Sequence, residues 1–106
     1  MDGSIPGDPV LSGLTLETFA PAVGQSFTVG DPDGTRVELL LVEAEAKDSG
    51  PHAPRPPFSL LFQGPADPLL PQATYRFEHP SLGVMGIFIV PLGHDEHGAT
   101  YEAVFA

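Results

Sequence analysis

Short segments of alternating apolar and polar residues, separated by proline and glycine, dominate this chain. The largest group lies between Phe58 and Val90, where FSLLFQG, ATYRFEH and VMGIFIV are joined by PADPLLPQ and by the turn PSLG. Side chains of a β-strand point alternately to the two faces of a sheet, whereas proline and glycine interrupt strands. The stretch therefore predicts three strands at the centre of a small antiparallel sheet, joined by one long and one tight connection.

Two more strands are predicted before this stretch, and one after it. SFTV and RVELLLVEAEA flank the turn residues Gly30 to Gly34 and indicate a hairpin, while TYEAVFA alternates near the end of the chain. In RVELLLVEAEA, the alternate positions that are apolar at Val37 and Leu41 become glutamate from Glu43 onward. Such a switch requires a bulge near Leu40 to Glu43 or a bent strand, and both are typical of a barrel-like or strongly coiled sheet.

A short helix is predicted in LTLETFAPAVG, ahead of the first strand. Thr15 is a suitable N-cap, and Leu16, Phe19 and Val23 recur at the spacing of one helix face. Because the proline within the segment disfavours helical geometry before it, we expect one or two turns that end by Gly24.

The length and these elements define a single domain. A chain of 106 residues can bury one modest core, so we expect a flexible N-terminal tail over residues 1–13 and one β domain over residues 14–106. The predicted fold class is all-β, a small antiparallel barrel or two-sheet sandwich of about six strands with one short N-terminal helix. The alternation assigns the following residues to the core: Phe27, Val37, Leu39, Leu41, Phe58, Leu60, Phe62, Tyr75, Phe77, Phe88, Tyr101 and Phe105.

The segment from Val84 to Val90 is apolar on both parities, as in strands that are covered on both faces. We assign the parity of Phe88 to the core and expect the other parity to be covered by the helix, which favours a monomer. A homodimer that buries the same residues is the alternative, because a contiguous exposed apolar patch is unusual on a monomer. The covered set is Met85, Ile87 and Ile89.

Composition excludes several classes of function. Fourteen acidic residues against four basic ones give a formal net charge of −10 at pH 7, which disfavours nucleic acid and anionic membranes as partners. The absence of cysteine removes thiolate nucleophiles and cysteine-based metal sites. No apolar run approaches the roughly 18 residues of a membrane span, and no export signal is visible, so we expect a cytoplasmic protein.

Two segments carry candidate binding chemistry, although no catalytic or cofactor motif is present and we expect no cofactor. Pro54, Arg55, Pro56 and Pro57 form a stiff segment that loses little entropy on binding, which favours a non-enzymatic module that contacts a protein partner. The alternative is a small metal-binding protein or metal-dependent enzyme, whose nitrogen and oxygen ligands would come from one histidine- and acid-rich segment. That segment, which a solvated hairpin turn also explains, is His94, Asp95, Glu96 and His97.

His79 is the remaining notable polar residue, because it follows Tyr75 and Phe77 on the inward parity of its segment. It is either a buried, oriented imidazole or a residue that closes a strand by bonding to the backbone of the turn after it. The second interpretation is the more common one and is our prediction.

The segments FSLLFQGPADPLLPQATYRFEHPSLG and LTLETFAPAVGQSFTV resemble a family of small, uncharacterised bacterial proteins classed only as a domain of unknown function. The resemblance covers nearly everything after Leu14 and is most specific over residues 58–64, 68–72 and 75–83. Members look like neighbours of phage-tail-collar proteins of the microcystin-dependent type. The resemblance therefore implies an accessory role in a phage-tail-like or surface-fibre system, with no catalytic or binding residues to carry over.

Overall fold

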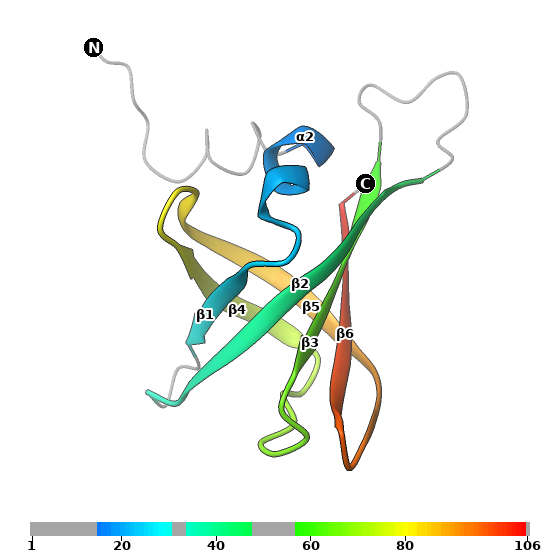
Figure 1. Cartoon of the computed structure of the whole chain (residues 1–106). Coiled ribbons are helices and arrows are strands. Elements are labelled where there is room, and N and C mark those ends of the chain that lie inside the picture. The colour runs from blue at the N-terminus through cyan, green and yellow to red at the C-terminus, as the bar shows by residue number, and fades with distance from the viewer. Residues whose placement is uncertain (1–14, 31–33, 48–56, 106) are drawn as a thin grey trace.

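The computed structural model describes residues 15–30, 34–47 and 57–105, so the tail expected over residues 1–13 lies outside the described residues. Two short helical elements precede six strands (Figure 1). In chain order they are α2 (Leu16–Phe19), η1 (Ala20–Ala22), β1 (Ser26–Gly30), β2 (Arg36–Ala46), β3 (Phe58–Gly64), β4 (Ala73–His79), β5 (Gly83–Asp95) and β6 (Gly98–Phe105).

The six strands form a closed antiparallel barrel in the order β1-β2-β3-β6-β5-β4. Strands β1 to β3 make a first meander and strands β4 to β6 a second one, in which each strand pairs with the next along the chain. The meanders meet along two seams, β1 with β4 and β3 with β6. The predicted all-β class and short helix are confirmed, and of the two predicted architectures the barrel is the one formed.

A register shift between Leu41 and Glu43 confirms the bulge predicted in β2. After the shift, Ala44 lies opposite the buried Leu60 and packs against the core, while the glutamates on either side of Ala44 are exposed. The sequence did not predict a second shift, between Pro91 and Gly93, where β5 pairs with β6. Both irregularities help the strands bend into a closed sheet.

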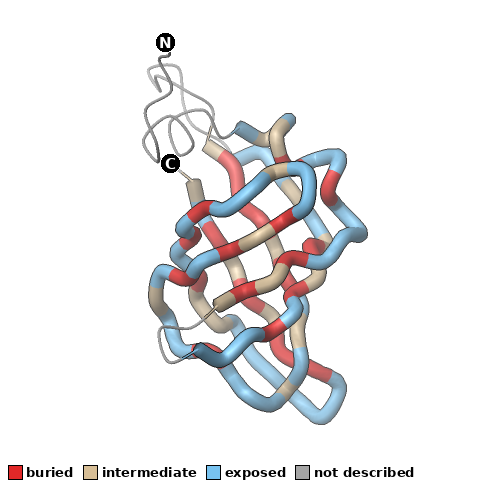
Figure 2. Tube along the Cα trace, turned by 90° about the vertical axis from the view of Figure 1, so that its left-hand side faces the viewer, coloured by how far each residue is buried: buried red, intermediate tan, exposed pale blue. Residues whose placement is uncertain are grey.

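Aromatic rings fill the barrel interior. The ring of Phe27 makes an edge contact with Phe62, at 5.6 Å between centroids, and Phe62 lies 5.1 Å from Phe77. Figure 2 shows how buried and exposed positions alternate along the strands. Of the predicted core residues, all but Phe88 and Phe105 are buried, and Phe105 is partly buried and stacks on Phe58 at 4.6 Å.

The face assignment of β5 was wrong. Phe88 is 50% exposed, and Met85, Ile87 and Ile89 are buried inside the barrel. Pairing with β4 explains the inversion, because Met85 lies opposite Phe77 and Ile87 opposite Tyr75, both of which point inward. No surface is therefore offered to a second copy of the chain by Met85, Ile87 and Ile89. Phe88 and the residues on its parity lie on the outer face of β5 instead.

The helix covers one end of the barrel instead of the outer face of β5 (Figure 1). Phe19 is fully buried there, with its ring 5.9 Å from Phe58 and 5.6 Å from Phe105. Val23, expected on the same helix face, is 41% exposed, and Ala22 is buried in its place. The reason is local: the chain tightens into the 3₁₀ turn of η1, and three residues per turn put Ala22 in line with Phe19.

The connection between β3 and β4 covers the opposite end. Leu70 is buried, and its backbone N–H donates to the Tyr101 hydroxyl at 2.9 Å. The Tyr75 hydroxyl donates to the Pro71 carbonyl at 2.7 Å. Leu69, the residue before it, is 40% exposed.

Candidate functional site

The predicted proline-rich contact segment falls largely outside the described residues, which include only Pro57 of the set Pro54, Arg55, Pro56 and Pro57. Pro57 is partly buried, and its carbonyl accepts the Lys47 N–H at 2.9 Å, next to the start of β3. Phe58 then pairs with Phe105 of β6, and Ser59 lies opposite Val104. Pro57 thus lies next to the residue that pairs with the end of β6.

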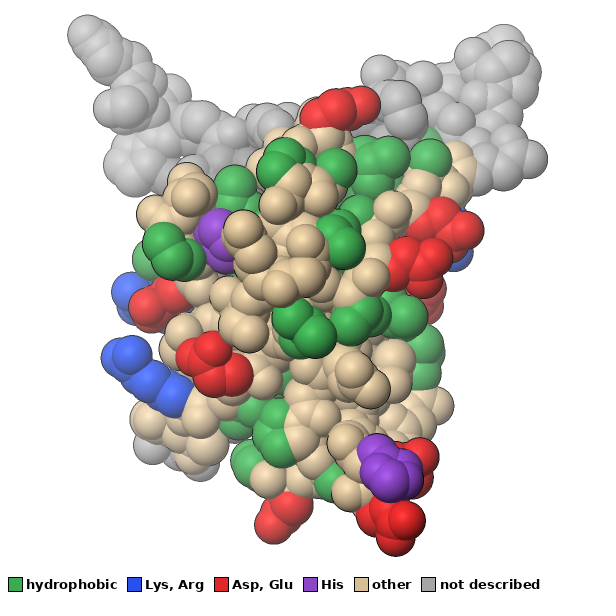
Figure 3. All heavy atoms as spheres, in the orientation of Figure 1, with side chains coloured by type: hydrophobic (Ala, Val, Ile, Leu, Met, Phe, Trp, Pro, Cys, Tyr) green, Lys and Arg blue, Asp and Glu red, His purple; other side chains and the backbone are tan. Residues whose placement is uncertain are grey.

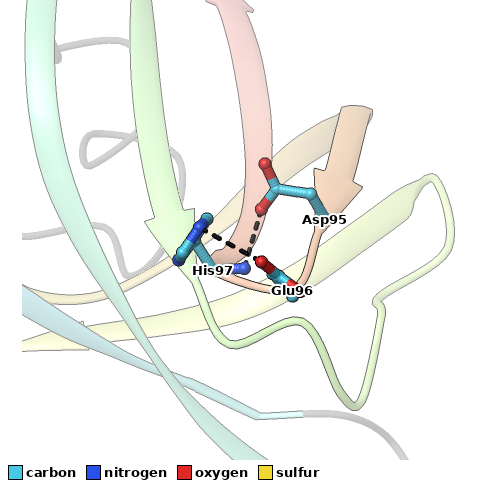
Figure 4. A network of polar contacts seen from close by, with 3 residues as sticks. All are labelled: Asp95, Glu96 and His97. Atoms are coloured by element: carbon cyan, nitrogen blue, oxygen red, sulfur yellow. Dashed lines mark hydrogen bonds and ion pairs between the residues drawn. The ribbon is translucent and has the colours of Figure 1, made fainter.

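The histidine- and acid-rich segment forms the exposed end of the β5–β6 hairpin (Figure 4). The His97 N–H donates to Asp95 Oδ1 at 2.8 Å, an arrangement typical of aspartate in a turn. His97 Nε2 lies 3.6 Å from Glu96 Oε2, and both of these side chains are more than four-fifths exposed, at 82% and 86%. In Figure 3 this histidine- and carboxylate-bearing tip projects at the lower right.

Across the described residues, no three or more His, Asp and Glu side chains gather in an arrangement that could hold a metal ion. His94, Asp95, Glu96 and His97 all lie on the hairpin surface, and His94 pairs with Ala99 as part of the β5–β6 ladder. The geometry around them is that of an exposed turn.

His79 closes β4, as predicted. Its side chain is buried, and Nδ1 accepts the N–H groups of Ser81 at 3.0 Å and Leu82 at 3.2 Å. Because Nδ1 is an acceptor, Nε2 carries the proton of the neutral ring and donates to Gln25 Oε1 at 2.6 Å. The ring also packs 4.8 Å from that of Phe27, so His79 ties the β4–β5 turn to the residues just before β1.

A groove of about 460 Å³ crosses the outer face of β2, β1 and β4. We call it the arginine groove. The residues that line it include Thr28, Gly30, Arg36, Thr74, Arg76 and Glu78. Gly30 pairs with Arg36 on one side and with Arg76 on the other, so the two arginines flank a glycine in one row across three strands.

The charges in this groove are only partly balanced. Arg76 Nε lies 3.1 Å from Glu78 Oε2. Next to the groove, the Thr28 hydroxyl donates a hydrogen bond to Glu38 Oε2 at 2.8 Å. Arg36 forms no ion pair with any residue in the described part of the chain. In Figure 3 basic side chains gather at the left edge of the molecule, beside carboxylates. Two of the four basic residues of an acidic chain thus meet on one small surface.

Sequence reasoning missed this groove because it treated Arg36 and Arg76 as ordinary polar positions on separate strands. Only the β1–β4 seam that closes the barrel brings them together. The sequence showed only that Gly30 begins a predicted turn, that Arg36 follows this turn, and that Arg76 occupies a polar position in the middle of another predicted strand. This pattern says nothing about which strands become neighbours.

A second surface feature is an apolar strip on the outer faces of β5 and β6. It consists of Val84, Phe88 and Leu92 from β5 and Val104 from β6, all about half exposed. Val90 pairs with Glu102, and Phe88 and Val104 are the next outward-facing residues beyond this pair on the two strands.

Among the residues that the structure describes, no helix is long and apolar enough to cross a membrane. What these features define is a small closed antiparallel β-barrel with a side-chain-filled interior, whose candidate sites are on its outer surface. The chain belongs to the protein family described as Domain of unknown function (DUF6916), whose model matches residues 14–105. The resemblance to an uncharacterised domain family is therefore confirmed. No curated protein and no solved structure matches the chain.

Proposed function

We propose that the protein is a non-enzymatic protein-binding module that contacts its partner through the apolar strip of β5 and β6. The observation that carries this proposal is Phe88, an aromatic side chain that is 50% exposed on the outer face of a sheet, with Val104 at 58% on the neighbouring strand. Aromatic side chains are enriched at the energetic centres of protein interfaces, and clustered exposed apolar residues often mark such surfaces.

Two further observations support binding on the outside of the barrel. Phenylalanine rings from several strands fill the interior, as in small barrels that hold no ligand. The proline-rich segment remains a predicted contact region. It is followed by Phe58, the first residue of β3, and the next residue, Ser59, pairs with Val104. Pro57, the described end of that segment, is therefore near Val104 of the apolar strip in the β3–β6 ladder.

The cellular setting is part of the same proposal. We place the module in the cytoplasm, as an accessory of a phage-tail-like or surface-fibre system, because the sequence resembles proteins encoded beside phage-tail-collar proteins. The excess of 14 acidic over four basic residues favours a protein partner over nucleic acid or an anionic membrane.

The test begins with capture of partners from lysate of the native host by the intact chain, followed by binding measurements with the purified partner. Phe88→Ser combined with Val104→Ser should raise the dissociation constant by at least about tenfold, because the loss of a buried aromatic anchor typically costs about 2 kcal/mol or more. The control is Val23→Ser, which makes the same kind of change at an exposed residue of similar accessibility beside the helix.

A third variant replaces residues 51–57 by a Gly/Ser linker of equal length, which measures the contribution of the proline-rich segment separately. All variants should keep the thermal stability of the parent, because the substituted side chains at positions 88 and 104 are half exposed. Equal affinity of the parent and the Phe88→Ser/Val104→Ser variant would show that the apolar strip is not the contact surface.

A further inference from the structure

We propose that the arginine groove binds a ligand through a single carboxylate group, held between Arg36 and Arg76 above Gly30. This site lies over β2, β1 and β4 and adjoins the apolar strip, because its lining residue Thr74 is the register partner of Phe88. The proposal for its ligand does not depend on the proposed protein partner.

The backbone fixes the spacing of the two arginines. Gly30 is the register partner of both, and neighbouring strands are about 4.8 Å apart, so the Cα atoms of Arg36 and Arg76 flank Gly30 at about 10 Å from one another. A Cβ atom built on Gly30 would have no neighbouring atom within 4 Å. The glycine therefore leaves open space between two guanidinium-bearing side chains, where a small planar group fits.

The donors in the groove match a carboxylate. A guanidinium group has five N–H donors in a planar fork, and the contact with Glu78 engages Nε of Arg76. Arg36 has no ion-pair partner in the described chain, so it offers its full fork. The groove is also lined by Thr74, whose hydroxyl can donate to the same ligand.

Charge decides between a carboxylate and a more highly charged anion such as phosphate. The described lining has two guanidinium groups and the Glu78 carboxylate, and a second carboxylate, Glu38, lies beside it at the Thr28 hydroxyl. The whole chain has a formal net charge of −10, so its field repels an incoming dianion more strongly than a monoanion. A ligand with one carboxylate therefore brings less negative charge next to Glu38 and Glu78 than phosphate does.

The experiment is an NMR titration of the intact chain at constant ionic strength with three probes: succinamate, which has one carboxylate, its neutral analogue succinamide, and inorganic phosphate. We expect succinamate to shift the backbone amides of Gly30 and Arg76 and the side-chain Nε–H signals of Arg36 and Arg76 in a saturable way. Succinamide should not shift them, and phosphate should bind more weakly than succinamate. Phosphate binding as tight as succinamate binding, or no saturable shift with succinamate, would overturn the proposal.

Three variants tie the binding to the groove. Arg36→Gln should weaken succinamate binding by about tenfold, because it removes a charge-assisted hydrogen bond to the carboxylate. Gly30→Val should abolish binding by filling the space between the arginines, and it should not destabilise the fold, because valine suits a strand and the added Cβ meets no atom. Lys47→Gln removes the same charge outside the groove, from a lysine whose Nζ lies 3.9 Å from Glu102, and should leave binding unchanged. A folded Gly30→Val protein that still binds succinamate like the parent would refute the site.

Discussion

His79 shows how one polar side chain can hold together two parts of the barrel. Its Nδ1 accepts two N–H groups of the β4–β5 turn, and its Nε2 contacts Gln25, which precedes β1. The turn contacts could be predicted because the residues that follow His79 are typical of a turn. The contact with Gln25 could not, because Gln25 comes near only through the β1–β4 seam.

We expect the neutral His79 ring to carry its proton on Nε2, since Nδ1 must accept from Ser81 and Leu82. Long-range ¹H–¹⁵N correlation spectra of the imidazole distinguish the two tautomers directly. His79→Ala should lower the free energy of unfolding by about 1–3 kcal/mol, because it leaves those two N–H groups without their acceptor. His94→Ala is the matched control at an exposed position and should have little effect in the same denaturant titration. A protonated Nδ1, or equal stability of the two variants, would contradict this account.

For strand β5, the alternation of the sequence could not show which face lies inside the barrel. Both of its parities are apolar, so a period of two identifies a strand and cannot say which face is inside. The register with β4 decides, since Met85 and Ile87 lie opposite Phe77 and Tyr75. One signal was present in the sequence: Gly86 lies on the parity of Phe88, and a glycine cannot help to fill a core.

The two faces of β5 should respond differently to truncation. Ile87→Ala is expected to destabilise the protein by about 2–5 kcal/mol, because it opens a cavity in the packed interior. Phe88→Ala removes a larger side chain, yet should cost under about 1 kcal/mol, because that ring is half exposed. Urea titrations of the two variants under the same conditions make the comparison. A larger loss for Phe88→Ala would mean that the face assigned to the core from sequence was the right one.

In the other strands, elements were predictable where local chemistry decides them. The switch of parity after Leu41 predicted the bulge, and Thr15 predicted the start of the helix. The helix docking site was not predictable, because it depends on the aromatic cluster that Phe19 joins with Phe58 and Phe105 at the barrel end. The arginine groove could not be predicted for the same reason, because Arg36 and Arg76 become neighbours only when β1 pairs with β4 and closes the barrel.

At the scale of the whole molecule, the sequence left barrel and sandwich open because both accommodate six alternating strands. The difference lies in the two seams, where β1 pairs with β4 and β3 with β6. Seven successive residue pairs join β3 to β6 in unbroken register, from Phe58 with Phe105 to Gly64 with Ala99. Because the barrel is closed, each of the six described strands has a hydrogen-bonded neighbour on both sides, which protects a small β protein from edge-to-edge aggregation.

The arrangement in two meanders also means that the chain crosses from one half of the barrel to the other only once between strands, through residues 65–72. A break between Pro68 and Leu69, both exposed, would leave every strand whole. It would also keep Leu70 on the same piece as Tyr101, to which it is hydrogen-bonded. Each piece would then be a three-stranded sheet whose apolar face is covered only when the two pieces meet.

We therefore expect the fragments 1–68 and 69–106, produced separately, to assemble into an equimolar complex with the circular dichroism spectrum of the intact barrel. Sedimentation of the mixture should show a single species with the mass of the uncut chain. Fragments divided at Gly86, inside β5, should fail to assemble, because that cut interrupts the ladder with β4. If the fragments 1–68 and 69–106 also remain unfolded and separate, the covalent connection between the halves is required for the barrel to close. If they assemble, the two halves recognise each other through the β1–β4 and β3–β6 seams, and the protein can be used as a split pair of fragments.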